Sequence, residues 1–93
     1  MIVGTLELVL VIRGCASLKE KRSVLKPIKE SIRRKFNVSV AEVEDQDMHQ
    51  KAVLAVAAVG NEKRFVESVL TQVGNHVRMN PWAEVASVSM EIL

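Results

Sequence analysis

Apolar and polar residues alternate along residues 2–13, the pattern of a β-strand with one buried face. One parity is strongly apolar: Ile2, Leu6, Leu8, Leu10 and Ile12. The other parity carries Thr5, Glu7, Val9, Val11 and Arg13. Gly14 interrupts the alternation, so we predict that the first strand ends there.

The apolar spacing then changes to that of a helix. Ser17 precedes Glu20 by three residues, as in a capping box, and the apolar residues that follow are Leu25, Ile28, Ile32 and Phe36. Pro27 lies inside this pattern, where it removes a hydrogen bond at a cost of about 3 kcal/mol. Two alternatives follow: one bent helix over 18–36, or a short turn over 17–24 and a helix that begins at Pro27. We favour the single bent helix.

The remaining chain repeats the order strand, helix, strand after one hairpin. Residues 37–44 predict a strand, the polar run 44–51 a hairpin tip, and 52–60 a strand that is apolar on both faces and therefore central. A second helix is expected over 62–77, with Phe65, Val66, Val69, Leu70 and Val73 on its buried side. A loop containing Pro81 leads to a last strand within 83–93.

The order β-α-β-β-α-β predicts an α+β fold of the ferredoxin-like type. Right-handed crossovers and a short central hairpin give a four-stranded antiparallel sheet with two helices on one face. The chain has 93 residues, enough for one small hydrophobic core, so we expect a single domain over 1–93.

Composition indicates a globular chain from a reducing compartment. Hydrophobic residues make up 48% and charged residues 26% of the sequence. The single cysteine, Cys15, excludes an intramolecular disulfide and a Cys-His zinc spacing. The apolar start has no basic region before it, contains Glu7 and is too short to span a bilayer. We therefore expect a cytoplasmic protein without membrane association.

Positive charge is concentrated in the first predicted helix. Residues 17–36 hold eight Lys or Arg and two Glu, a net charge of +6, whereas the rest of the chain holds five basic and nine acidic residues, a net charge of −4. Five of the cations fall within about 80° of one another on a helix. We call them the basic stripe: Lys19, Arg22, Lys26, Lys29 and Arg33.

The basic stripe has two interpretations. It could be a solvated helix face whose aliphatic stems cover the edge of the core. However, like charges four residues apart repel by a few tenths of a kcal/mol, so a helix face that served stability alone would mix acidic and basic residues. A clustered cationic stripe is typical of a surface that binds a polyanion, and such binding weakens steeply with salt.

Several segments resemble a known family. They are "GTLELVLVIRG" (4–14), "SLKEKR" (17–22), "FNVSVAEV" (36–43), "DQD" (45–47) and "MEIL" (90–93). Together they resemble the YlxP-like family of small conserved bacterial proteins, a domain of unknown function. The resemblance implies a ferredoxin-like fold and no established activity. The family's genes often lie among those for transcription and translation factors, which points toward RNA or ribosomes. This sequence departs from the family pattern at Pro27, where we would expect an ordinary helix-forming residue.

The kind of RNA follows from where the aromatics lie. A ferredoxin-like sheet binds single strands when aromatics on its open face stack bases. The residues of the first strand that face the open side include no aromatic side chain. We expect the two phenylalanines, Phe36 and Phe65, in the helix cores. A basic helix lying on the backbone of structured RNA or the ribosome fits better. The same open face leaves Val9 and Val11 uncovered, and exposed apolar area predicts a homodimer interface there.

The acidic tip of the predicted hairpin is a weaker candidate. It gathers Glu42, Glu44, Asp45, Asp47 and His49. Such ligands suit several divalent ions, but the spacing of a calcium loop is absent. We interpret this segment as an exposed polar turn, in which Gln46 and Asp47 either pin the turn or meet a partner, and expect no metal.

Catalytic signals are also weak. Cys15 precedes a helix, but the spacing of a phosphatase loop is not met, so a buried residue is expected. Arg13 and Asn61 match an acylphosphatase only loosely, and His49 and His76 have no nucleophile at a telling spacing. Trp82 is expected to cover the end of the core; the less favoured alternative is an exposed anchor for a partner.

We therefore expect a non-catalytic protein without a cofactor, which binds structured RNA or the ribosome through the basic stripe. The alternative is a regulatory or scaffolding module that dimerises through its sheet and binds a small ligand or protein, as ACT-like domains do.

Overall fold

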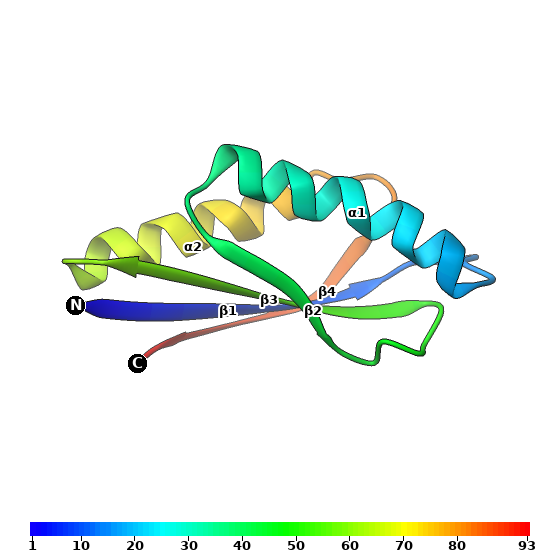
Figure 1. Cartoon of the computed structure of the whole chain (residues 1–93), viewed down its shortest axis with the longest axis horizontal. Coiled ribbons are helices and arrows are strands. Elements are labelled where there is room, and N and C mark those ends of the chain that lie inside the picture. Colours follow the sequence, from blue (N-terminus) through cyan, green and yellow to red (C-terminus); the bar gives the residue numbers. More distant parts are fainter.

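The computed structural model describes all 93 residues and shows the predicted order of elements. They are β1 (Ile2–Val11), α1 (Leu18–Lys35), β2 (Ser39–Glu44), β3 (Lys51–Gly60), α2 (Lys63–Arg78) and β4 (Glu84–Ile92). The sheet order is β2-β3-β1-β4 with every neighbour antiparallel, and both helices lie on one side of it (Figure 1). The ferredoxin-like prediction is confirmed.

The core lies between the helices and the even-numbered face of β1. Leu8 faces Leu54 of β3 across the strand pair, and Leu6 faces Val56, so the apolar side chains of both central strands point the same way. All four are at most 1% exposed. Because side chains alternate along a strand, this register leaves odd-numbered residues of β1 on the face without helices.

The capping box predicted at Ser17 and Glu20 starts α1. Ser17 Oγ accepts a hydrogen bond from Glu20 N at 3.1 Å, and Glu20 Oε2 accepts one from Ala16 N at 2.8 Å. The helix runs without a break through Pro27, which excludes the alternative of a separate turn. Pro27 and Ser23 are both exposed, so water can satisfy the Ser23 carbonyl that Pro27 leaves without its usual donor.

Two aromatic placements predicted from the sequence are wrong. Phe65 is 59% exposed rather than buried, because it lies about 120° around α2 from the centre of the buried face. That face consists of Val66, Leu70, Val73, Gly74 and Val77. Trp82 is 73% exposed, and its small neighbour Ala83 enters the core instead. Neither helix is long and apolar enough to cross a lipid bilayer.

Two glycines give a matched test of this packing. A Cβ on Gly4 would lie 2.6 Å from Val66 Cγ1 and 2.9 Å from Leu70 Cδ1, whereas one on Gly74 would meet nothing closer than 3.8 Å. We expect Gly4→Ala to lower the free energy of unfolding by about 1–3 kcal/mol through overpacking. Gly74→Ala should raise it by about 1 kcal/mol, because alanine favours a helix interior. Urea denaturation measures both, and equal effects of the two substitutions would contradict the packing described.

Candidate functional site

The basic stripe lies along the flank of α1 that borders the edge strand β2. Lys19, Arg22, Lys26 and Arg33 are exposed, and Lys29 is half-buried. Arg33 Nη2 donates a hydrogen bond to the carbonyl oxygen of Val40 in β2 at 2.9 Å, which places this end of the stripe beside the strand. The five cations therefore lie on one side of one helix, as the helical periodicity predicts.

None of the five stripe cations forms an ion pair. The ion pairs of the chain are Arg13 with Glu84, Lys21 with Glu42, and Lys51 with Asp45. The two carboxylates of α1 do not approach the stripe within 4.0 Å: Glu20 caps the helix, and Glu30 makes no ion pair. The positive charge of the stripe is therefore left to the solvent or to a partner.

Lys21, a cation of the same helix outside the basic stripe, is buried. Lys21 is 1% exposed, and it shares the buried side of α1 with Leu25, Ile28 and Ile32. Its Nζ donates to the carbonyl oxygens of Met48 at 2.7 Å and Asp45 at 2.9 Å, with Gln46 O farther away at 3.4 Å. The tip of the β2–β3 hairpin thus wraps around an ammonium group.

Glu42 completes this cage. Its Oε2 lies 2.6 Å from Lys21 Nζ, and the glutamate side chain is 15% exposed. Oε2 is buried and meets no donor at hydrogen-bonding angles, so the contact is an ion pair rather than a well-aligned hydrogen bond. The short distance is enough to make this ion pair favourable, because the attraction between two charges in a poorly hydrated site depends little on the angle.

The backbone of the hairpin tip is shaped for this contact. Asp45 adopts a left-handed conformation with φ of +55°, which turns the chain around Lys21. Its carboxylate pairs with Lys51 at 3.0 Å, and Gln46 Nε2 donates to the carbonyl oxygen of Glu42 at 3.1 Å. The acidic residues Glu42 and Asp45 therefore hold lysines of this chain, and Gln46 pins the turn, as the sequence had suggested.

Sequence reasoning missed Lys21, although the signal was present. Counting back four residues from Leu25 along the apolar side of the helix leads to Lys21. The periodicity assigns five cations to the basic stripe, and Lys21 falls instead on the buried side of the helix. A small hollow of about 290 Å³ lies beside it and is lined by Leu18, Lys21, Arg22, Glu42, Gln46 and Asp47.

The hollow joins the segments "SLKEKR" and "EVEDQD", which are far apart in the sequence. Residues 3–90 match the model of a family described as "Protein of unknown function (DUF503)". The chain belongs to this family.

A relative and a solved structure support the assignment. The chain is 39% identical over 71 residues to "Uncharacterized protein YlxP" of Bacillus subtilis (strain 168), covering 76% of this chain and 77% of that protein. Its fold is similar to the solution structure of a de novo designed ferredoxin-fold protein, with a TM-score of 0.60 and 9% identity over 99% of this chain and 85% of the other. The structural likeness concerns the fold alone.

The proposed dimer residues lie on the face that the helices leave open. Val9 and Val11 are both half-buried, and Val53 opposite Val9 is 2% exposed. On the other side of β1, however, β4 brings polar residues to the same face: Ser87, Ser89 and Glu91. The apolar part of the open face therefore lies on β1 and β3 and extends to Ala41 of β2, and a dimer through it stays a prediction.

The loose acylphosphatase candidates Arg13 and Asn61 lie too far apart in this fold to share a site, and Cys15 is equally far from Asn61. Asn61 follows Gly60, which pairs with Ile2 at the start of β1, whereas Arg13 and Cys15 follow the end of that strand. Nearly the whole of β1 separates them. Arg13 instead pairs with Glu84, and the buried Cys15 Sγ donates to the carbonyl oxygen of Ser17 at 3.3 Å.

One pair of polar residues was not expected. Ser31 Oγ of α1 lies 2.6 Å from His76 Nε2 of α2, and the ring of Phe36 packs edge-on against His76 at 5.7 Å. His76 has no hydrogen-bonded carboxylate, and neither residue lines the larger surface hollows. We interpret the pair as a polar contact between the helices. Spacing along the chain could not reveal it, because the two residues are 45 positions apart.

We expect Lys21 to be essential for stability. Lys21→Met should lower the free energy of unfolding by about 3–5 kcal/mol, because it leaves Glu42 buried without a counter-charge. The control Lys19→Met, on the exposed side of the same helix, should change it by less than about 0.5 kcal/mol. Thermal and urea denaturation compare the two. A Lys21→Met protein as stable as the Lys19→Met control would refute the role assigned to the cage.

The interhelical pair predicts a dependence of stability on pH. Burial and, secondarily, the charge of Lys35 lower the pKa of His76 from its ordinary 6.5. The unfolded chain therefore takes up this proton at a higher pH than the folded one, and the free energy of unfolding falls as the pH drops below about 6.5. His76→Gln should reduce the loss of stability between about pH 7 and about pH 5. His49→Gln, at an exposed histidine, is the control and should leave it unchanged.

Proposed function

We propose that this protein is a non-catalytic factor that binds the phosphate backbone of structured RNA, ribosomal RNA in particular, through the basic stripe of α1. The observation that carries the proposal is the absence of any carboxylate within 4.0 Å of the five stripe cations. The acidic residues of the chain that form ion pairs do so with other cations, so the stripe cations are not neutralised within the chain.

The division of labour within α1 supports this function. Lys21 points inward and holds the hairpin, while the stripe cations point outward and hold nothing but one backbone carbonyl. Arg34 and Lys35 in the last turn add two further cations without ion pairs. Apart from the bond of Arg33 to Val40 O, the side chains of the stripe make no hydrogen bond or ion pair within the chain, and their like charges repel.

The size of the stripe suits a polyanion. From Lys19 to Arg33 the helix rises by about 21 Å, and phosphates follow one another along a duplex at a much shorter spacing. Arg33 is oriented by its bond to Val40 O, and a guanidinium has five donors, so most of its donors stay available for phosphate oxygens. Contacts of this kind position a protein on RNA without reading its sequence.

The alternative of a sheet-mediated regulatory dimer has less support. The polar residues of β4 reduce the apolar area of the open face. One hollow reaches this face at Val11, but it lies at the end of the sheet and is lined mostly by residues 78–85. We therefore retain RNA binding as the function that the charge distribution favours.

The test is a filter-binding assay with ribosomal RNA over a series of salt concentrations. Lys26→Glu combined with Lys29→Glu should weaken binding and lower the slope of log affinity against log salt by about two, because two phosphate contacts are lost.

Lys63→Glu combined with Arg78→Glu is the matched control, since it reverses the same charge at two exposed positions of α2. Equal affinities and slopes for the two double variants would show that net charge, and not the stripe, governs any binding.

A further inference from the structure

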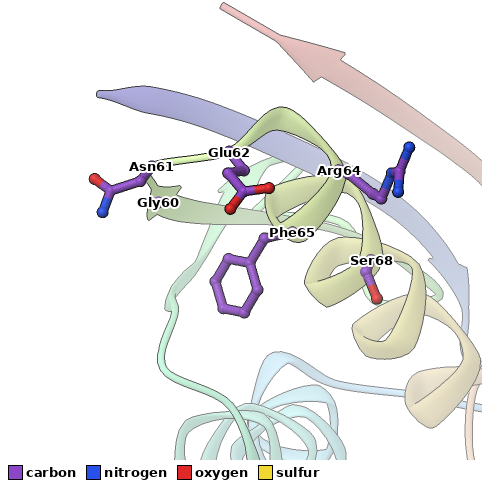
Figure 2. A pocket seen from close by; sticks show the side chains of 6 residues that line it. All are labelled: Gly60, Asn61, Glu62, Arg64, Phe65 and Ser68. Carbon is purple, nitrogen blue, oxygen red and sulfur yellow. The ribbon is translucent and has the colours of Figure 1, made fainter.

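An exposed aromatic ring lies beyond the C-terminal end of α1. Phe65 in the first turn of α2 is 59% exposed, and Figure 2 shows its ring projecting away from the helix below Glu62. A hollow of about 650 Å³ surrounds it, lined by Gly60, Asn61, Glu62, Arg64, Phe65 and Ser68. A large aromatic side chain at such a place is available to a partner.

Gly60 explains how the ring is held. A Cβ built on Gly60 would lie 3.0 Å from Phe65 Cδ2, so the missing side chain lets the ring rest against the end of β3. A second, smaller hollow of about 210 Å³ continues from the ring toward α1 and is lined by Lys35, Phe36, Asn37, Ala58, Val59, Phe65 and Val69. The ring therefore has a supported side against Gly60 and borders two hollows.

Phe36, the other aromatic residue of this region, already has contacts on its ring within the chain. Its ring packs against His76, and Lys35 Nζ lies 5.7 Å from the centre of the ring. Phe65 has neither an aromatic partner nor a cation over its face. Of the two rings, Phe65 is the one that can receive a flat ligand.

The charges around Phe65 indicate what kind of ligand it would be. Two cations, Lys35 and Arg64, and one carboxylate, Glu62, line the two hollows, which gives a net charge of +1. Neither cation forms an ion pair. Arg33, two residues before Lys35, is the last member of the basic stripe. The aromatic site thus follows the stripe at the end of the same helix, and the amides of Asn37 and Asn61 at the rims offer hydrogen-bond donors and acceptors.

We propose that Phe65 stacks an unpaired base of the RNA whose backbone lies along the basic stripe. Aromatic side chains stack bases of any identity, and unpaired bases in bulges and loops are the ones that can leave the helix to do so. The inference rests on the proposed function and refines it: the preferred ligand is a duplex with an unpaired nucleotide rather than a continuous duplex.

Trp82, the other exposed aromatic, has surroundings that fit less well. The hollows beside it hold two cations, Arg13 and Arg78, and two carboxylates, Glu84 and Glu20, so they carry no net charge. Arg13 is in addition paired with Glu84. Trp82 therefore serves as a matched control: it is an exposed aromatic at a different site, and replacing it removes a similar ring.

The experiment compares hairpin RNAs that differ only in one unpaired nucleotide, placed at successive positions along the stem. We expect the wild-type protein to bind the best of these bulged RNAs about tenfold more tightly than the continuous stem. Phe65→Ala should bind both RNAs with the affinity of the continuous stem, while Trp82→Ala should keep the tenfold preference. Far-ultraviolet circular dichroism checks that the variants are folded.

A spectroscopic reading follows the ring directly. In a Trp82→Phe background, Phe65→Trp gives a protein with one tryptophan at the proposed stacking position, and the bulged RNA should quench its fluorescence more than the continuous stem. A preference for the bulge that persists in Phe65→Ala, or equal binding of the two RNAs by the wild type, would overturn the inference and leave backbone binding intact. Failure of the wild type to bind either RNA would overturn the proposed function as well.

Discussion

The ammonium group of Lys21 fastens α1 to the β2–β3 hairpin. It is buried, its protons are directed to the carbonyl oxygens of Asp45 and Met48, and its charge is balanced by Glu42. A buried lysine without such partners would lose several kcal/mol in desolvation, so the hairpin tip has to wrap around it whenever α1 docks. This contact sets the position of α1 against the edge of the sheet, and with it the direction in which the other cations of the helix point.

Once Lys21 is fixed inward, the basic stripe has to face outward along β2. The apolar residues Leu25, Ile28 and Ile32 hold the same side of the helix in the core. Arg33 then reaches the carbonyl of Val40 at the edge strand, which protects part of that edge from pairing with another chain. The same helix thus serves two purposes, and the two sets of cations are separated by its geometry.

The two ends of α1 differ in what surrounds them. At its start, the hollows beside the exposed Trp82 hold as many carboxylates as cations, and one of the cations, Arg13, is paired with Glu84. At its end, α2 presents Phe65 beside Glu62 and two cations, Lys35 and Arg64, that form no ion pair. The difference arises from the crossover: Gly60 and Asn61 bring the first turn of α2 beside the last turn of α1, although the two segments are separated by the whole of the hairpin.

The sequence by itself determined the elements, their order and the fold, because each rests on local periodicity, capping and turn residues that act over a few positions. It also determined that five cations share one flank of α1, since a helical period decides this without any tertiary contact. Only the tertiary structure decided that Lys21 is buried, that Ser31 meets His76, and that Phe65 and Trp82 are exposed. These outcomes depend on which segments, distant in the sequence, pack against each residue. A long side chain such as lysine is compatible with either environment until its partners are in place.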